Sequence, residues 1–222
     1  MDTRLIAIGY GDVAGPATDP GLRRRLSESG CSAVQVNLDD ADVAAAMRFG
    51  PGDAEGRPIG GFVSAWTSDV PATLALLAEV GPVYRVTEHR RLDPPVVPDG
   101  ARAEALANVA VLRRPASMSR DDYLDRWLVH HTPIAIRTQA TFGYVQNVVE
   151  EALTPDAPEI AAIVEELFPS AAIEDVHAFY GSGGDDAELH RRITELMASV
   201  ARFGADTGLD LVPTSRYRWV RP

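Results

Sequence analysis

The sequence contains no lysine, so all 21 of its basic residues are arginine, and Cys31 is its single cysteine. Without a lysine amine, Schiff-base chemistry, a pyridoxal-phosphate anchor and a P-loop are excluded. A single cysteine excludes an intrachain disulfide, a Cys-x-x-Cys redox pair and an iron–sulfur cluster, and it fits a reducing, cytoplasmic location. No apolar run approaches the roughly 18 residues of a membrane span, and the first ten residues lack the features of a secretory signal. The sequence therefore predicts a protein that neither spans a membrane nor enters a secretory route.

Positive charge is also scarce, because 32 acidic residues outnumber the basic ones and give a net charge of -11. Nucleic acids and anionic lipids both reward clustered positive charge, so neither is an expected partner. The one basic run, Arg23 to Arg25, is typical of the solvated face of a short helix. Apolar residues make up 45% of the chain and charged residues 24%, which is ordinary globular composition with enough material for a core.

The first part of the chain alternates between short apolar runs and helical segments. Asp19 and Pro20 have the pattern of an N-cap followed by proline at the first helical position. The predicted elements are strands at 4–10, 33–38, 59–66 and 83–91, helices at about 20–30 and 70–79, and a helix or helical turn at 39–47.

Residues 93–102 contain Pro94, Pro95, Pro98 and Gly100, and this composition is typical of a linker. After it the same pattern of elements returns. The predicted strands lie at 105–112, 143–149, 163–168 and 215–220, and the predicted helices at 119–137, 171–180 and 185–206. The sequence thus predicts an α+β protein of two ferredoxin-like βαββαβ halves, residues 1–92 and 103–222, whose antiparallel sheets cover each other.

The helix that begins after Ser119 carries the most chemically capable side chains. At 100° per residue, Tyr123, Trp127 and His131 fall on one apolar face, and His130 lies at its margin. A lone inward histidine is most often a core residue whose ring nitrogens are satisfied by backbone or water. Pro133 favours a functional role, because it cannot donate to the carbonyl of residue 129 and should kink or restart the helix beside His131. A pKa of His131 within reach of neutral pH is then an expectation.

On the following predicted strand, Tyr144 and Gln146 share one face and Asn147 lies on the other. A strand tyrosine that packs against a helix is the commoner outcome, but Tyr144 could also donate a hydrogen bond to a substrate oxygen beside His131. His177 and His190 lack a partner at zinc-site spacing, so no metal site is predicted. The Gly-x-Gly-x-x-Ala stretch at 9–14 resembles a dinucleotide fingerprint, but Gly15, Pro16 and Asp19 are expected to delay the helix that such a site needs.

The pattern Arg-Pro-x-x-Met-Ser-x-x-x-Tyr-x-x-x-Trp-x-x-x-His-x-Pro, from Arg114 to Pro133, resembles the EthD family of dimeric α/β-barrel proteins. The strand at 144–147 and the helical segment at 197–203 are similar to the same family. The resemblance covers residues 105–219, while residues 1–92 resemble the fold far more faintly. It implies ferredoxin-like units that pair into a barrel, here through two halves of one chain, and it also allows a homodimer.

For function, the resemblance implies a small apolar or aromatic ligand. Barrels of this kind act as dehydratases, cyclases, isomerases or monooxygenases, and EthD itself belongs to an oxidative ether-degradation system. The leading hypothesis is cofactor-independent acid/base chemistry on an aromatic, polyketide-like or lactone substrate, with His131 and Tyr144 catalytic. Trp127, Tyr123, His130 and Gln146 would contact the substrate. The alternatives are a non-catalytic accessory protein and a cofactor-free monooxygenase. One pocket per chain is expected, because the first helix, near residues 22–29, has neither histidine nor tryptophan.

Overall fold

The strands of the chain close into one antiparallel barrel in the order β1-β3-β2-β8-β5-β7-β6-β4, as seen in a computed structural model that describes residues 2–155 and 157–220. The strands are β1 (Thr3–Tyr10), β2 (Cys31–Leu38), β3 (Ile59–Thr67), β4 (Val83–Leu92), β5 (Leu106–Leu112), β6 (Gly143–Ala152), β7 (Ala162–Phe168) and β8 (Asp210–Val220). Each half contributes four neighbouring strands, β4-β1-β3-β2 and β8-β5-β7-β6, which is the ferredoxin-like order. The halves join where β2 pairs with β8 and β4 pairs with β6. The predicted pseudo-dimeric barrel is therefore confirmed.

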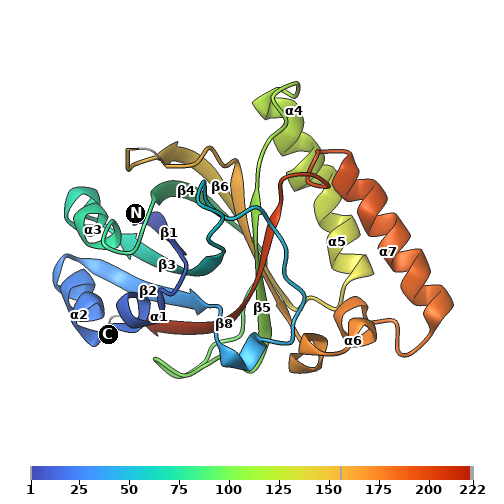
Figure 1. Ribbon diagram of the computed structural model, residues 1–222, viewed down its shortest axis with the longest axis horizontal. Coiled ribbons are helices and arrows are strands. Elements are labelled where there is room, and N and C mark those ends of the chain that lie inside the picture. The colour runs from blue at the N-terminus through green and yellow to red at the C-terminus, as the bar shows by residue number, and fades with distance from the viewer. Residues whose placement is uncertain (1, 156, 221–222) are drawn as a thin grey trace.

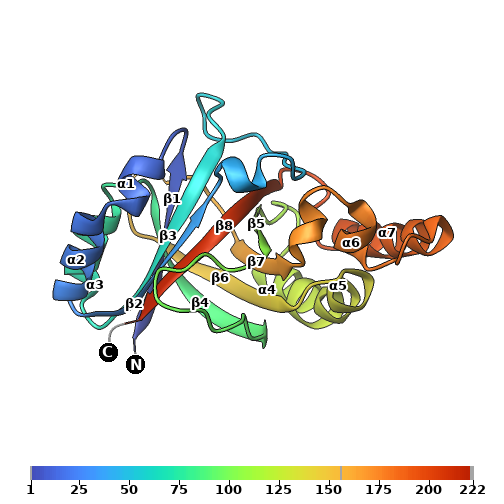
Figure 2. The same cartoon turned by 90° about the horizontal axis from the view of Figure 1, so that it is seen from below.

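The helices lie outside the barrel in two groups, one on each half (Figures 1 and 2). The first half carries α1 (Ala14–Thr18), α2 (Pro20–Glu28) and α3 (Val70–Leu77), and the short 3-10 helix η1 (Ala41–Val43) follows β2. The second half carries α4 (Arg120–Leu124), the π-helix η2 (Asp125–His131), α5 (Thr132–Thr138), η3 (Ser170–Ile173), α6 (Val176–Tyr180) and α7 (Asp186–Ala201). No helix among the described residues is long and apolar enough to cross a bilayer.

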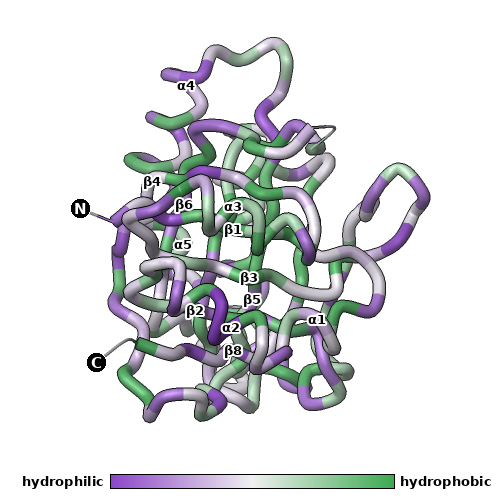
Figure 3. The backbone as a smooth tube through the Cα atoms, turned by 90° about the vertical axis from the view of Figure 1, so that its left-hand side faces the viewer, coloured by the Kyte–Doolittle hydropathy of each residue, from purple (hydrophilic) through white to green (hydrophobic). Residues whose placement is uncertain are grey.

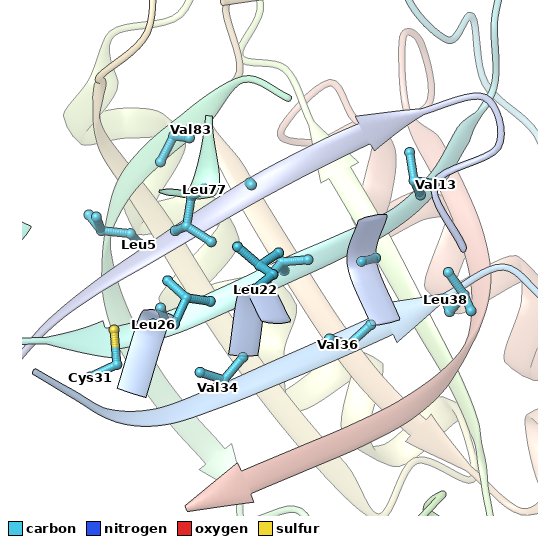
Figure 4. Close-up of a cluster of buried hydrophobic side chains, with 14 residues drawn as sticks. Leu5, Val13, Leu22, Leu26, Cys31, Val34, Val36, Leu38, Leu77 and Val83 are labelled. Carbon is cyan, nitrogen blue, oxygen red and sulfur yellow. The ribbon is translucent and has the colours of Figure 1, made fainter. Parts of the chain in front are cut away.

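The two helix layers differ in how they meet the sheet. In the first half, Leu22 and Leu26 of α2 pack directly on Leu5, Val34 and Val36 of the sheet, and the cluster is apolar throughout (Figure 4). Hydrophobic residues are concentrated along the central strands of this half (Figure 3). In the second half the helices and the sheet enclose a cavity.

Inside the barrel, an apolar cluster around Ile6, Phe62 and Val109 lies beside a polar network. The Arg4 guanidinium of the first half contacts Glu88 and donates to Asn147 of the second half, with a nitrogen-to-oxygen distance of 2.7 Å. Further along, the Glu165 carboxylate accepts from the Gln35 and Asn37 amides and pairs with Arg216, with a nitrogen-to-oxygen distance of 3.1 Å. The charged side chains Arg4, Glu165 and Arg216 are all buried. The network links the two halves through their shared interior.

Several predicted elements differ from the structure. The segment at 39–47, where a helix or a helical turn was expected, forms only the 3-10 turn η1, and its Val43 and Ala46 are buried. A five-residue helix, α1, begins at Ala14, so Gly15 and Pro16 do not delay the first helix as expected, whereas α2 begins at Pro20 behind the Asp19 N-cap as predicted. The closing strand begins at Asp210 rather than Ser215, and the helix expected over 171–180 is a 3-10 turn followed by α6. The long helix expected over 119–137 changes hydrogen-bond pattern at its centre.

A loop of the first half reaches across to the second half between η1 and β3. We call residues 47–52 the crossing segment. The backbone of Phe49 pairs with that of Leu211 in both directions, with N-to-O distances of 3.2 and 2.7 Å. The buried Asp210 carboxylate accepts from the Gly52 N–H at 3.0 Å and from Arg113 at 2.7 Å. The crossing segment is thus fixed to the start of β8.

Candidate functional site

A cavity of about 450 Å³ lies between the outer face of the second half's sheet and the helices that cover it. This volume is within the range of about 300–1,000 Å³ that is typical of small-molecule sites. Its walls are mostly apolar and come from β5, β6 and β7, from η2, from α6 and α7, and from the segment that leads into β8. Met47 and Phe49 of the crossing segment also line it, so the first half contributes to the site.

The helical wall is shaped by the π-helix η2. The Thr132 N–H donates to the Trp127 carbonyl five residues earlier, and the Thr132 hydroxyl donates to the same oxygen at 3.2 Å. Pro133 then occupies the first turn of α5, where a missing N–H costs nothing. The helix therefore neither stops nor restarts at Thr132, because the wider π-helical turn accommodates Pro133. A π-helical turn often occurs at a functional site.

His131 stands at the end of this wider turn and faces the cavity, with 7% of its surface exposed. Its Nδ1 lies 3.0 Å from the Ser199 Oγ of α7, and its ring centroid lies 4.8 Å from that of Phe203. Burial, with a smaller effect from Arg202, lowers the pKa of His131 to about 4. The pKa thus moves away from neutral pH, and the imidazole is neutral at pH 7. It can accept or donate a hydrogen bond there, but it is not charged.

Three polar side chains cross the sheet wall of the cavity in one row. Glu166 of β7 lies directly opposite Asn108 of β5 on one side and Tyr144 of β6 on the other. We call Asn108, Glu166 and Tyr144 the polar row; all three line the cavity. Directly opposite residues of an antiparallel pair have Cβ atoms about 4.5–5.5 Å apart.

Glu166 is the acidic member of this row, and its Oε1 is buried without a hydrogen-bond partner in the described part of the chain. Burial raises the pKa of Glu166 to about 7. Burial also raises the pKa of Tyr144 well above its usual value, and the Glu166 charge acts in the same direction. At neutral pH the row therefore holds a carboxyl group that exchanges readily between its two protonation states beside a tyrosine that keeps its proton.

Of the residues predicted from the sequence, Trp127, His131 and Tyr144 line the cavity together. Tyr123 is buried behind Trp127 and Phe203, with ring centroids 6.0 Å from each. Two further residues that were expected to contact a substrate lie elsewhere. Gln146 is buried and accepts a hydrogen bond from Arg91 at 2.8 Å, and His130 is exposed beside Asp125 at 3.3 Å. Neither is among the residues that line the cavity.

Sequence reasoning missed Glu166 and Asn108, although the strand at 162–168 held a signal for the first. It is apolar apart from two adjacent acids, Glu165 and Glu166, and adjacent strand residues point to opposite faces. In a closed barrel covered by helices both faces are buried, so one acid had to enter the barrel and the other had to face the helices. Met47 and Phe49 were missed because the loop that carries them has no periodicity. Among residues 2–155 and 157–220 there is no cluster of three or more potential metal ligands.

No protein-family model matches the chain, and no curated protein matches it in sequence. Solved structures match it over nearly its whole length. An anthrone oxidase-like protein is 8% identical, with 99% of this chain and 93% of that chain covered and a TM-score of 0.57. A candidate monooxygenase from Fusobacterium nucleatum is 6% identical, with coverage of 99% and 94% and a TM-score of 0.51. At such identities the likeness concerns the fold alone, and the chain has the fold of the dimeric α/β barrels, built from two halves of one polypeptide.

Proposed function

We propose that the chain is an enzyme that transfers protons on a small, largely apolar, oxygenated molecule held in the cavity, without a cofactor. Dehydration, cyclisation or isomerisation of an aromatic, polyketide-like or lactone substrate fits this chemistry. The observation that carries the proposal is Glu166, a half-buried residue that lines the apolar cavity, whose pKa is raised to about 7 and whose Oε1 is buried without a partner in the described part of the chain. A general acid/base works best when its pKa lies near the operating pH.

In this proposal Glu166 is the group that takes and returns the proton. Its carboxylate removes a proton from a carbon that is conjugated with a carbonyl group, directly or through an aromatic ring, and the electron pair of the broken C–H bond is delocalised onto the carbonyl oxygen to form an enolate. The Tyr144 hydroxyl, which keeps its proton, donates a hydrogen bond to that oxygen. The carboxylic acid form of Glu166 then returns the proton to the same or another atom. The neutral His131 supplies a second hydrogen-bonding group on the opposite wall, and Trp127 supplies an apolar surface.

The proposed relation to the EthD family rests on the motif from Arg114 to Pro133. This stretch covers α4 and η2 and so supplies the helical wall of the cavity, including Trp127 and His131. In that relation His131 would be the catalytic residue. The Glu166 carboxyl group adds a second group, whose pKa near 7 suits proton transfer at neutral pH better than that of His131.

The test is hydrogen–deuterium exchange at the acidic C–H of anthrone, a fused-ring ketone, followed by NMR in D2O without oxygen. The enzyme should accelerate exchange over buffer, and Glu166→Gln should lower the rate by about 10²–10⁴-fold, the usual range for general acid–base catalysis. Tyr144→Phe should have a smaller effect. The matched control is Asp206→Asn, which removes an acidic group from the exposed rim of the same cavity and should keep the rate.

An unchanged rate in Glu166→Gln would contradict the assignment of Glu166. Binding of anthrone without any acceleration of exchange would instead favour the non-catalytic accessory protein.

A second candidate is a cofactor-free monooxygenase, favoured by the match in fold to the anthrone oxidase-like protein. The same enolate would react with O2; one oxygen atom would enter the substrate as a carbonyl group and the other would leave as water. Oxygen consumption with anthrone, coupled to formation of the quinone, tests this candidate. Exchange without oxygen consumption would restrict the enzyme to acid/base chemistry.

A further inference from the structure

Two residues that line the cavity each carry a buried acceptor oxygen without a donor from the described part of the chain: Asn108 with its Oδ1 and Glu166 with its Oε1. Asn108 is 3% exposed, and the strand register places it directly opposite Glu166. A buried polar atom without a partner costs about 1–3 kcal/mol, and most such atoms in native proteins are paired. Two neighbouring unpaired acceptors on one cavity wall therefore indicate that the missing donor comes from the ligand.

The charged residues that line the cavity indicate whether a ligand that supplies this donor is neutral or charged. Among the described residues that line it, Glu166 and Asp206 are the ionisable acids, and no arginine is present. An anionic ligand such as a carboxylate would find no countercharge, and desolvation of an unpaired charge is costly. The remaining walls are apolar or aromatic, including Trp127, Phe179 and Phe203. These features fit an uncharged ring system that carries a hydroxyl group.

We propose that Asn108 and Glu166 jointly accept a hydrogen bond from a hydroxyl group of an uncharged ligand, and that Asn108 thereby determines which ligands bind and in which orientation. The inference rests on the proposed function in one respect, because the same Glu166 is the proposed proton-transfer group. It adds a residue, Asn108, and a requirement for a hydroxyl donor. With the hydroxyl group fixed at Asn108 and Glu166, the neighbouring ring atoms lie within reach of the Glu166 carboxyl group.

The test compares three probes that share one ring system, in fluorescence or calorimetric titrations at pH 7. 2-Naphthol carries the hydroxyl donor, 2-methoxynaphthalene keeps the oxygen but lacks the donor, and 2-naphthoate is an anion. The protein should bind 2-naphthol at least about tenfold more tightly than 2-methoxynaphthalene, which corresponds to one well-formed hydrogen bond. It should bind 2-naphthoate more weakly than 2-naphthol.

In Asn108→Leu the preference for 2-naphthol should fall by about three- to tenfold, while the affinity for 2-methoxynaphthalene stays close to that of the wild type. Gln139→Leu is the matched control, because it removes an amide that lines the same cavity but does not belong to the polar row, and it should leave the preference intact. The comparison of probes on the wild-type protein keeps the proposal testable if Asn108→Leu does not fold.

Equal affinities of the wild type for 2-naphthol and 2-methoxynaphthalene would overturn the inference. In that case the protonated Glu166 would satisfy Asn108 internally. Tighter binding of 2-naphthoate would overturn it as well. The deuterium-exchange experiment separates this failure from that of the proposed function. If deuterium exchange on anthrone depends on Glu166 but the protein does not prefer 2-naphthol over 2-methoxynaphthalene, only the role of Asn108 is contradicted. If the protein prefers 2-naphthol but does not accelerate exchange, only the proposed catalysis is contradicted.

Discussion

Ionisation of Glu166 opposes folding, because the buried carboxylate has no countercharge in the cavity. Burial raises its pKa in the folded state from the usual 4.5 to about 7. A carboxyl group with a raised pKa gives its full stability below pH 4.5, and this stability is lost as the pH rises through 7. The residue that suits proton transfer thus weakens the fold at neutral and alkaline pH.

Glu166→Gln should therefore stabilise the protein at alkaline pH relative to the wild type. The difference in free energy of unfolding between variant and wild type should grow by up to about 3 kcal/mol between pH 4.5 and pH 8.5, since each pKa unit corresponds to about 1.4 kcal/mol. Urea unfolding at both pH values measures it. Glu28→Gln on the exposed face of α2 is the control. A difference that does not change with pH would show that Glu166 ionises normally.

At the residue scale, the sequence predicted those parts of the site that follow a regular period. The helical period placed Trp127 and His131 on one face, and the strand alternation placed Tyr144 toward the helices. It could not predict the pKa of His131, because that value depends on burial against Phe203 and Ser199, which are distant in the sequence. Glu166 and Asn108 meet only through the register of β5 with β7, which the sequence of either strand does not specify.

At the scale of elements, the crossing segment decides how the mouth of the cavity is covered. Met47 and Phe49 line the cavity although 55% and 49% of their surfaces are exposed. Gly50 has a φ of +145°, and a Cβ atom there would lie 2.1 Å from Asp210 Oδ1 and 2.7 Å from the Asp210 Cα. The close approach of the crossing segment to β8 therefore requires glycine at position 50.

Gly50→Ala should displace the crossing segment and weaken binding of 2-naphthol several-fold, because Met47 and Phe49 lose their positions over the cavity. Global stability should change little, since the segment lies outside the barrel. The control is Gly56→Ala, where φ is also positive, at +74°, but a Cβ atom would meet nothing within 4 Å. Titration and thermal unfolding of both variants test the prediction, which would be wrong if the two variants bound the probe equally well.

The order of the strands and most of the helices could be predicted, because each is marked by alternation, by helical period or by a capping residue. The segments that failed have no such pattern. The acidic stretch at 39–47, expected to be a helix or a helical turn, forms the 3-10 turn η1 and leads into the crossing segment. The π-helix η2 lets the helix continue past Pro133 while it stays packed against α7. No periodic pattern in the local sequence predicts this change of hydrogen bonding.

At the scale of the whole molecule, the charged network inside the barrel joins the two halves. The Glu165 carboxylate and the Arg216 guanidinium are 4% and 3% exposed, and they pair within a network that includes Gln35 and Asn37. Removing one partner of a buried pair leaves the other charge without compensation, at a cost of about 3–5 kcal/mol.

Glu165→Ala should therefore lower the free energy of unfolding by about that amount, in one transition that both halves share. Trp66 reports on the first half and Trp127 on the second, so fluorescence of single-tryptophan variants can follow each half separately. The midpoints of the two signals should coincide in the wild type and in Glu165→Ala. Separate midpoints would mean that the halves unfold independently and that the network does not couple them.

The helices of the first half pack directly on the sheet, whereas those of the second half enclose a cavity. This difference affects which substitutions the chain can accept during evolution. Where Asn108, Glu166 and Tyr144 cross the sheet of the second half, the corresponding strands β1, β3 and β2 carry the apolar row Leu5, Ala65 and Val34. In a barrel of two identical subunits, an unpaired buried carboxyl group would appear twice and its energetic cost would double. One polypeptide can keep a stable half without such groups and let the other half accumulate substitutions that favour new substrates. We expect the fold to tolerate substitutions around the cavity that broaden the substrate range. The stability that allows these substitutions should come from the apolar core of the first half.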